Sequence, residues 1–369
     1  QYSINGIQSE FGYTKVLNGY SFDEKSKQSL IGKNVLAEGY IDQSGLFIMQ
    51  AITPANLFTA SKADGAPDHL QEIIVKRGAR KFIFNEMNKN ENSQSEISFR
   101  TTFFEKKNNP VVPGDDFLVI TLSGRQGDTF GSVNGHMVAG IGEVKDDLTL
   151  RGEVSNAYVT NGKDILSGNT SLTNYFSHTV QGQNNYRPTY TLIAYGIDKS
   201  KLQQFRDALE ESHVKFRTEK LDITPQFNCT TETIKALKNV GITGKYRRID
   251  NWITAIFSSP AYLFGESGRT LHYSLRNDPS TFQPRPAYNS FVKTFLSKGL
   301  RKKLGIKRVD FIYYSQIPSS RPVGGMALGT IFGALKWKKM YDKYEVNEST
   351  KLGPVELRPL LKEKLQSIE

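Results

Sequence analysis

The chain has 369 residues, with a single cysteine and five histidines, and it carries a formal net charge of +11 with an isoelectric point near 9.4. This length allows two or three domains, each with its own hydrophobic core. One cysteine excludes an internal disulfide, and no Cys/His cluster has zinc-site spacing, so we expect no structural metal and no cofactor. No apolar run reaches the roughly 20 residues that span a bilayer.

The positive charge predicts an anionic partner, either an anionic membrane surface or a cell-wall polymer. Nucleic acid is not expected, because the sequence holds no binding motif for it and no aromatic residues interleaved with Gly and Arg. The chain begins at Gln1 and not at Met, as removal of an export leader would leave it.

Residues 1–110 are predicted to form a β-rich N-terminal region without a catalytic motif. Runs of alternating, β-branched or aromatic residues are separated by polar stretches that contain Gly, Asn and Pro. These predicted strands are Leu46–Gln50, Glu72–Lys76, Lys81–Phe84 and Ile97–Phe104.

Residues 111–160 predict a three-stranded meander. Pro113-Gly114-Asp115 opens the first strand, a Gly-rich loop follows it, and His136 comes near the start of the second strand. The predicted strands are Phe117–Leu122, His136–Val144 and Leu148 to about Val154. A histidine on a strand can be held rigidly, as a general base requires, although a histidine packed in the sheet would give the same pattern. Gly135 and Gly140 indicate that something approaches this backbone closely, or that the strand has a bulge.

Three elements are predicted between the meander and the cysteine. Residues 160–185, rich in Asn, Gly, Ser and Thr, predict a long surface loop that contains His178, a reserve candidate for the base. Tyr190–Ile197 predicts a strand. A capping box from Ser200 to Gln203 then predicts a helix that ends near His213.

Cys229 is predicted to lie in the first turn of a helix. Asn228 is a good N-cap, Glu232 follows Cys229 at capping-box spacing, and the apolar residues Ile234 and Leu237 share one helical face before Gly241. Free backbone N–H groups and the positive end of the helix dipole favour a thiolate at this position, and a thiolate is the nucleophile of cysteine enzymes. A small buried cysteine without a catalytic role is the alternative.

Residues 246–369 are predicted to be a helical, basic C-terminal region. The stretch 293–308 contains seven Lys and Arg residues and no acid, with apolar residues at helical spacing, and 323–335 is apolar and Gly-rich. Such a pair is typical of a bilayer-surface contact. An ordinary core helix with solvated lysines explains the pattern at least as well.

The motifs together resemble a known group of enzymes. PGDDFLVI at 113–120, HMVAGIGEV at 136–144 and the Asn228-Cys229 helix start are similar to elements of the circularly permuted papain-like thiol enzymes, which include NlpC-type peptidases and the lecithin:retinol acyltransferase group. The run from Tyr190 through Phe227-Asn-Cys-Thr-Thr231 is most similar to the periplasmic thiol domain of Lnb-type lipoprotein acyltransferases. The resemblance covers about residues 110–245, and it implies a bacterial cell-envelope protein, periplasmic or exported, that can lie peripherally on a membrane.

The resemblance implies Cys229 as nucleophile and His136 as base. A hairpin about the Asp146-Asp147 turn would place positions 155–157 opposite His136, so Asn156 is the candidate that orients the imidazole, with Glu153 behind it. The backbone N–H of Cys229 would contribute to an oxyanion hole. Gly135, Asn228 and Thr230, which flank the catalytic pair in the sequence, are the expected substrate contacts.

The predicted fold is therefore α+β, with a permuted papain-like core in which an antiparallel sheet packs on the Cys-bearing helix. Its predicted divisions are 1–110, 111–245 and 246–369. The expected activity is thiol-dependent acyl transfer or hydrolysis through an acyl-cysteine, acting on lipid-borne or lipoprotein acyl groups at a membrane surface. An NlpC-type peptidoglycan peptidase or amidase is one alternative, and a non-catalytic binding or adhesion module on a papain-like core is another.

Overall fold

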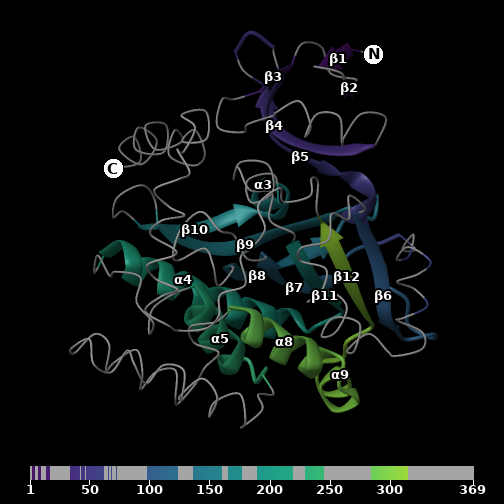
Figure 1. Ribbon diagram of the computed structural model, residues 1–369, viewed down its shortest axis with the longest axis vertical. Helices are drawn as coiled ribbons and strands as arrows, with labels where there is room; N and C mark the ends of the chain where they lie inside the picture. The colour runs from purple at the N-terminus through teal and green to yellow at the C-terminus, as the bar shows by residue number, and fades with distance from the viewer. Residues whose placement is uncertain are drawn as a thin grey trace, which may run out of the picture.

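The computed structural model describes residues 2–4, 7–9, 14–16, 34–41, 43–45, 47–61, 65, 68, 72, 98–123, 136–159, 165–176, 189–218, 229–244 and 284–314. Within these residues the fold mixes helix and strand around one antiparallel sheet of seven strands (Figure 1).

The seven-stranded sheet has the order β10-β9-β8-β7-β11-β12-β6, and every neighbouring pair is antiparallel. Its interior strands β11 and β12 are buried along their whole length, which explains their nearly continuous apolar and aromatic sequences. The strands are β6 (Phe99–Glu105), β7 (Asp116–Ser123), β8 (His136–Val144), β9 (Leu150–Val159), β10 (Ile165–Ser171), β11 (Thr189–Tyr195) and β12 (Arg308–Tyr314).

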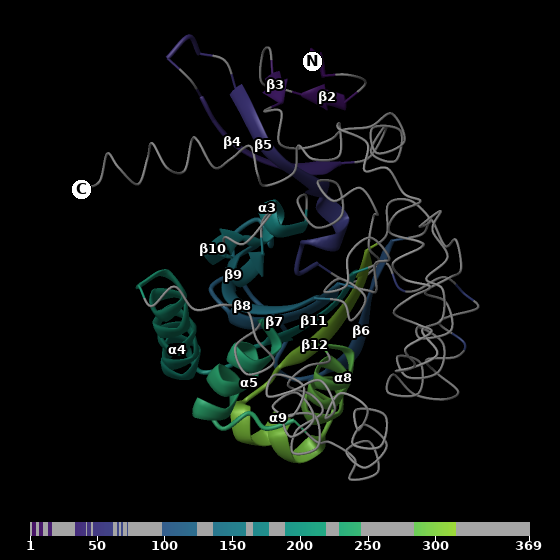
Figure 2. The ribbon, with the colours of Figure 1, turned by 60° about the vertical axis from the view of Figure 1, so that its left-hand side comes forward.

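Among the described residues, four helices cover one face of this sheet: α4 (Lys199–Thr218), α5 (Cys229–Asn239), α8 (Pro284–Phe295) and α9 (Lys298–Leu304) (Figure 2). The stripe of Leu202, Phe205 and Leu209 on α4 is buried in the core between helices and sheet. Ile234 and Leu237 on α5 enter the same core, so the apolar face that the sequence predicted fixes α5 against β8 and α4.

The other face of the sheet is covered by the short 3-10 helix η1 (Ala55–Leu57), by α3 (Leu172–Phe176) and by the chain around Phe58. Their side chains form a second core with strand residues such as Phe117 and Tyr195. Beyond it lies a small three-stranded sheet in which β5 (Phe47–Pro54) pairs with β4 (Val35–Ile41) and with β3 (Thr14–Val16) (Figure 1). A separate two-stranded sheet is formed by β1 (Tyr2–Ile4) and β2 (Ile7–Ser9).

Most of the strands predicted in the first two thirds of the chain are confirmed, with ends that shift by a few residues. They correspond to β5, β6, β7, β8, β9 and β11, and the helix start at Cys229 is confirmed as well. The strands predicted at Lys81–Phe84 and at Glu72–Lys76 lie outside the described residues, apart from Glu72.

Three predictions in the middle of the chain are wrong. Residues 160–185 are not one long loop, because β10 and α3 lie within them: the small polar residues of β10 occupy an edge strand, where one side of the strand stays open to solvent. Asp198, and not Ser200, caps α4, since its carboxylate accepts from the backbone N–H of Ser200 at 3.0 Å. The helix also continues five residues past His213, which is buried.

The sheet takes strands from all three predicted divisions, since β6 precedes residue 110 and β12 follows residue 246. The boundaries at 110 and 245 therefore cut across one sheet and one core. Residues 293–308 are not one helix: α8 ends at Phe295, α9 begins at Lys298, and β12 begins at Arg308. The apolar stretch 323–335 lies outside the described residues, and no described helix is long and apolar enough to cross a membrane.

Candidate active site

Cys229 is the first residue of α5, and its side chain is half-buried. The four residues after it, Thr230 to Thr233, are buried, so this helix start is held firmly inside the fold. Thr233 donates a hydrogen bond to the Cys229 carbonyl at 2.7 Å, and the Glu232 carboxylate accepts one from Ser212 on α4. These contacts fix the direction in which the helix presents the thiol.

His136 is the first residue of β8, and it meets both Cys229 and Asn156. The thiol of Cys229 hydrogen-bonds the His136 side chain. On the other side of the ring, Nε2 lies 2.6 Å from the amide oxygen of Asn156, which is buried on β9. Because an amide oxygen can only accept, this contact places the proton on Nε2 and leaves Nδ1 available to the thiol.

The pKa of the Cys229 thiol is lowered from its usual 9.0 to about 7. Burial acts in the opposite direction and raises the pKa, because it penalises the charged thiolate. The charge and hydrogen bond of His136, the backbone N–H of Met137 and the hydroxyl of Thr230 together outweigh that effect. A substantial fraction of the thiol is therefore ionised near neutral pH, as a nucleophile requires.

The pairing of β8 with β9 sets the position of Asn156. Ala139 lies opposite Ser155, so the hairpin that the sequence predicted brings Asn156 toward the His136 end of β8. Gly140 makes the close pairing of these strands possible: a Cβ there would lie 1.9 Å from the carbonyl oxygen of Glu153. The close approach that Gly140 indicated in the sequence is thus the neighbouring strand itself.

The structure brings together Cys229, His136 and Asn156, the three residues that the sequence proposed as catalytic. Thr230, expected as a substrate contact, is buried with its hydroxyl 3.8 Å from the Cys229 sulfur, so it contacts the thiol. Glu153, the second candidate for orienting the imidazole, is instead exposed and lies 3.6 Å from Arg206 on α4. The remaining candidates, Asn228, Gly135 and His178, lie outside the described residues.

One participant was not named from the sequence: the backbone N–H of Met137, which stabilises the thiolate. No residue-type pattern reveals such a donor, because every non-proline residue carries one. Its role follows only from the place where α5 crosses the start of β8. Among the described residues, no group of three or more His, Cys, Asp and Glu side chains could hold a metal ion.

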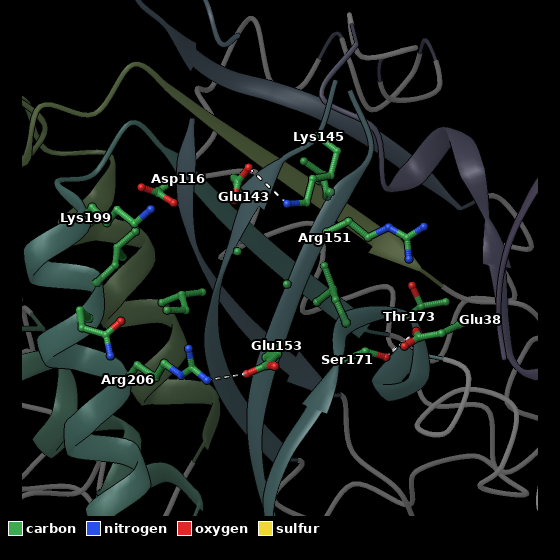
Figure 3. Close-up of a pocket in the computed structure, with 17 residues that line it drawn as sticks. Glu38, Asp116, Glu143, Lys145, Arg151, Glu153, Ser171, Thr173, Lys199 and Arg206 are labelled. Carbon is green, nitrogen blue, oxygen red and sulfur yellow. Dashed lines mark hydrogen bonds and ion pairs between the residues drawn. The ribbon is translucent and has the colours of Figure 1, made fainter. Parts of the chain in front are cut away.

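A separate cavity of about 470 Å³ lies over the other ends of β8 and β9 (Figure 3). Its walls are α4 on one side and the segment around Ser171 and Thr173 on the other, and none of the three catalytic candidates lines it. Four acids and four bases surround it, among which Lys145 pairs with Glu143 at 3.2 Å. The lining therefore has no excess of acidic or of basic side chains.

Comparison of the chain with protein-family models, with curated proteins and with solved structures found no match.

Proposed function

We propose that the protein is a cysteine-dependent enzyme that transfers or hydrolyses acyl groups through an acyl-cysteine intermediate. The observation that carries the proposal is the contact chain from the Cys229 thiol through His136 to Asn156, on a thiol whose pKa is about 7. A nucleophile, a base and a group that orients the base are the three parts such chemistry needs. We further propose a permuted papain-like core, supported by a cysteine at a helix start against an antiparallel sheet that carries the histidine.

The reaction would proceed in two halves. The Cys229 thiolate attacks an acyl carbonyl, and the resulting oxyanion is stabilised by the backbone N–H of Cys229 at the helix start. The His136 imidazolium donates its proton to the departing alcohol or amine, which leaves a thioester on Cys229. His136 then takes a proton from an amine or a water molecule, which attacks the thioester and restores the thiol.

The first substrate class we propose is a lipid-borne or lipoprotein acyl ester at an anionic membrane surface in the cell envelope. The sequence resemblance and the net charge of +11 support it. The stretch 293–304 supports it less than the sequence indicated, because Phe295 and Leu304 are buried in the core and do not face outward. The second class is an amide bond of peptidoglycan, which the same catalytic residues could cleave.

Intact-mass measurement of the acyl-enzyme tests the proposal directly. The protein is mixed with p-nitrophenyl esters of acetate, octanoate and palmitate, and we expect the mass of one acyl group to appear on the wild type and not on Cys229→Ser. Cys229→Ser keeps a side chain of similar size, so its circular dichroism should match the wild type. Absence of any adduct on the wild type would contradict the proposed chemistry.

Two assays then separate the substrate classes. Co-sedimentation with vesicles of phosphatidylglycerol and phosphatidylethanolamine supports the lipid class, and release of soluble fragments from cell-wall sacculi supports the peptidoglycan class. The binding-module alternative predicts neither an adduct nor rapid alkylation of Cys229. The thiol pKa of about 7, to which the charge and hydrogen bond of His136 contribute, supports the enzyme over this alternative.

A further inference from the structure

Arg100 on β6 is a buried cation whose hydrogen-bonding capacity is only partly used. Arg100 is 2% exposed, and its Nη2 donates to the carbonyl oxygen of Ser61 at 2.5 Å. The other two guanidinium nitrogens, Nε and Nη1, are buried without a hydrogen-bond acceptor among the described residues. Buried donors without acceptors are rare in folded proteins, and a buried charge without a partner is costlier still.

Arg308 on β12 lies beside the same chain segment and is fully paired, in contrast to Arg100. Its Nη2 donates to Asp310 at 2.6 Å, and its Nη1 donates to the carbonyl of Ala60 at 3.0 Å. The two guanidinium groups therefore bind two consecutive carbonyls, those of Ala60 and Ser61. They form a double cation beneath the segment that closes the second core.

Asp310 does not neutralise both arginines. It is fully buried, and its carboxylate already accepts from Arg308, from the Tyr195 hydroxyl at 3.1 Å and from the Thr102 hydroxyl at 2.8 Å. In the buried part of this cluster, two positive charges, those of Arg100 and Arg308, face one negative charge, that of Asp310. The Glu105 carboxylate adds a second negative charge from a half-exposed position, 4.0 Å from Nη1 of Arg308. Burial and the charge of Asp310 raise the pKa of Tyr195, and the charges of Arg308 and Arg100 act to lower it. Arg100 therefore interacts electrostatically with the same buried group as Arg308 and Asp310.

We propose that the face of Arg100 that bears Nε and Nη1 binds a small inorganic anion, such as chloride or an oxyanion of the sulfate and phosphate class. The anion would supply a negative charge directly at Arg100, and it would accept the two N–H groups that have no acceptor among the described residues. Charge-assisted contacts of this kind are among the strongest hydrogen bonds in proteins. This site is independent of the proposed catalytic function and lies on the other face of the sheet from the helices.

The expected role of the anion is to stabilise the junction between the small sheet and the main sheet. The segment at this junction carries the isolated bridge between Thr59 and Thr149, and Ala60 donates its N–H to the Leu148 carbonyl at 2.6 Å. Arg308 and Arg100 donate hydrogen bonds to the carbonyl oxygens of the next two residues, Ala60 and Ser61. A ligand that binds only the folded state raises stability with the logarithm of its concentration.

The test measures thermal unfolding in sodium chloride, sulfate and phosphate at constant ionic strength, with a large organic anion as the balancing salt. For the wild type we expect the unfolding temperature to rise by roughly 2 °C for each tenfold increase of the bound anion. For Arg100→Met we expect no such dependence. Without the small anion, this variant should be at least as stable as the wild type, because it removes an uncompensated buried charge.

Arg151→Met is the matched control, because it removes the same charge from an exposed position on β9. It should keep the anion dependence of the wild type, which separates a specific site from general screening of a basic protein. An equal dependence in wild type and Arg100→Met would overturn the proposal. If Arg100→Met does not fold, calorimetric titration of the wild type decides: saturable binding of one of the three anions supports the site, and no saturable heat with any of them refutes it.

Discussion

The Nε2 atom of His136 lies 2.6 Å from the amide oxygen of Asn156 on the neighbouring strand. This contact fixes the tautomer of the imidazole, since the amide oxygen requires a proton on Nε2 and so leaves Nδ1 for the thiol. The same amide oxygen accepts a hydrogen bond from the imidazolium that forms when Cys229 gives its proton to His136. One buried amide thus prepares the ring for both of its proposed tasks, as base and as acid.

The rate of Cys229 alkylation should follow the ionisation of the thiol. With iodoacetamide we expect the rate to rise with a midpoint at pH about 7, since the thiol pKa is about 7 in the folded protein. His136→Ala should move the midpoint upward, because it removes the charge and hydrogen bond that stabilise the thiolate. With a single cysteine in the chain, one adduct reports one site. A midpoint that does not respond to His136→Ala would refute the coupling of the pair.

The same ionisation links stability to pH. The folded-state pKa is lowered, so the thiolate stabilises the fold fully above the usual thiol value of 9.0, and this contribution is lost as the pH falls through about 7. Cys229→Ser should therefore lose stability relative to the wild type at pH 9 and much less at pH 6. Urea unfolding of both proteins at the two pH values measures the difference. An equal difference at both would contradict the lowered pKa.

Replacement of Asn156 should weaken the dyad without removing it. Asn156→Ala deletes the acceptor of the imidazolium proton, and a hydrogen bond to a charged group is worth about 1.5 kcal/mol, so the thiol pKa should rise by about one unit. Asn156→Asp should lower it, because a carboxylate stabilises the imidazolium further. Asn169→Ala is the control, since it removes a hydrogen bond to Ser155 on the same strand pair. Alkylation profiles of the three variants give the comparison, and identical profiles for Asn156→Ala and wild type would argue against the orienting role.

The elements around the site could be predicted because local signals specify them. Alternating and β-branched runs marked β7, β8 and β9, and the Asp146-Asp147 turn set a register that pointed to Asn156. The helix start at Cys229 was readable from the apolar spacing of Ile234 and Leu237. In each case the residues that carry the signal lie within about twenty positions of one another.

The elements that the sequence did not predict are determined by contacts between segments far apart in the chain. β12 was missed because Arg308–Tyr314 reads as a continuation of a basic helical stretch, yet it pairs with β11 on one side and with the edge strand β6 on the other. The polar sequence of β10 gave no sign that it would form the sheet edge next to β9. The partial pairing of Arg100 is likewise invisible in the sequence, since it depends on where Asp310 directs its carboxylate.

Gly140 should tolerate no side chain. The Cβ of Gly140→Ala would lie 1.9 Å from the Glu153 carbonyl oxygen and 2.6 Å from the Val154 Cα, so the backbones of β8 and β9 must separate. We expect a loss of about 3 kcal/mol in the free energy of unfolding, together with slower alkylation because Asn156 moves away from His136. Gly168→Ala on β10 is the control, because nothing lies within 4 Å of its Cβ. Similar stability of the two variants in urea unfolding would contradict the predicted close packing.

Among the ion pairs of the described residues, removal of the Asp310 charge should cause the largest loss in the free energy of unfolding. Asp310→Asn keeps the shape of the side chain but removes the negative charge that faces Arg308 in a fully buried setting. Breaking a buried pair leaves an uncompensated charge, so we expect a loss of about 3–5 kcal/mol. Glu143→Gln makes the same change at the half-exposed pair with Lys145, where exposed ion pairs contribute less than about 1 kcal/mol.

Urea unfolding with a common slope for all three proteins measures both losses on one scale. A small effect of Asp310→Asn would mean that another anion already neutralises Arg308 and Arg100 together. The anion proposed at Arg100 would then contribute more than Asp310 itself, and repeating the comparison in chloride and in the large organic anion would show it. If the loss instead stays small in both salts, the Arg308 charge does not depend on Asp310, and the anion proposed at Arg100 loses its supporting charge argument.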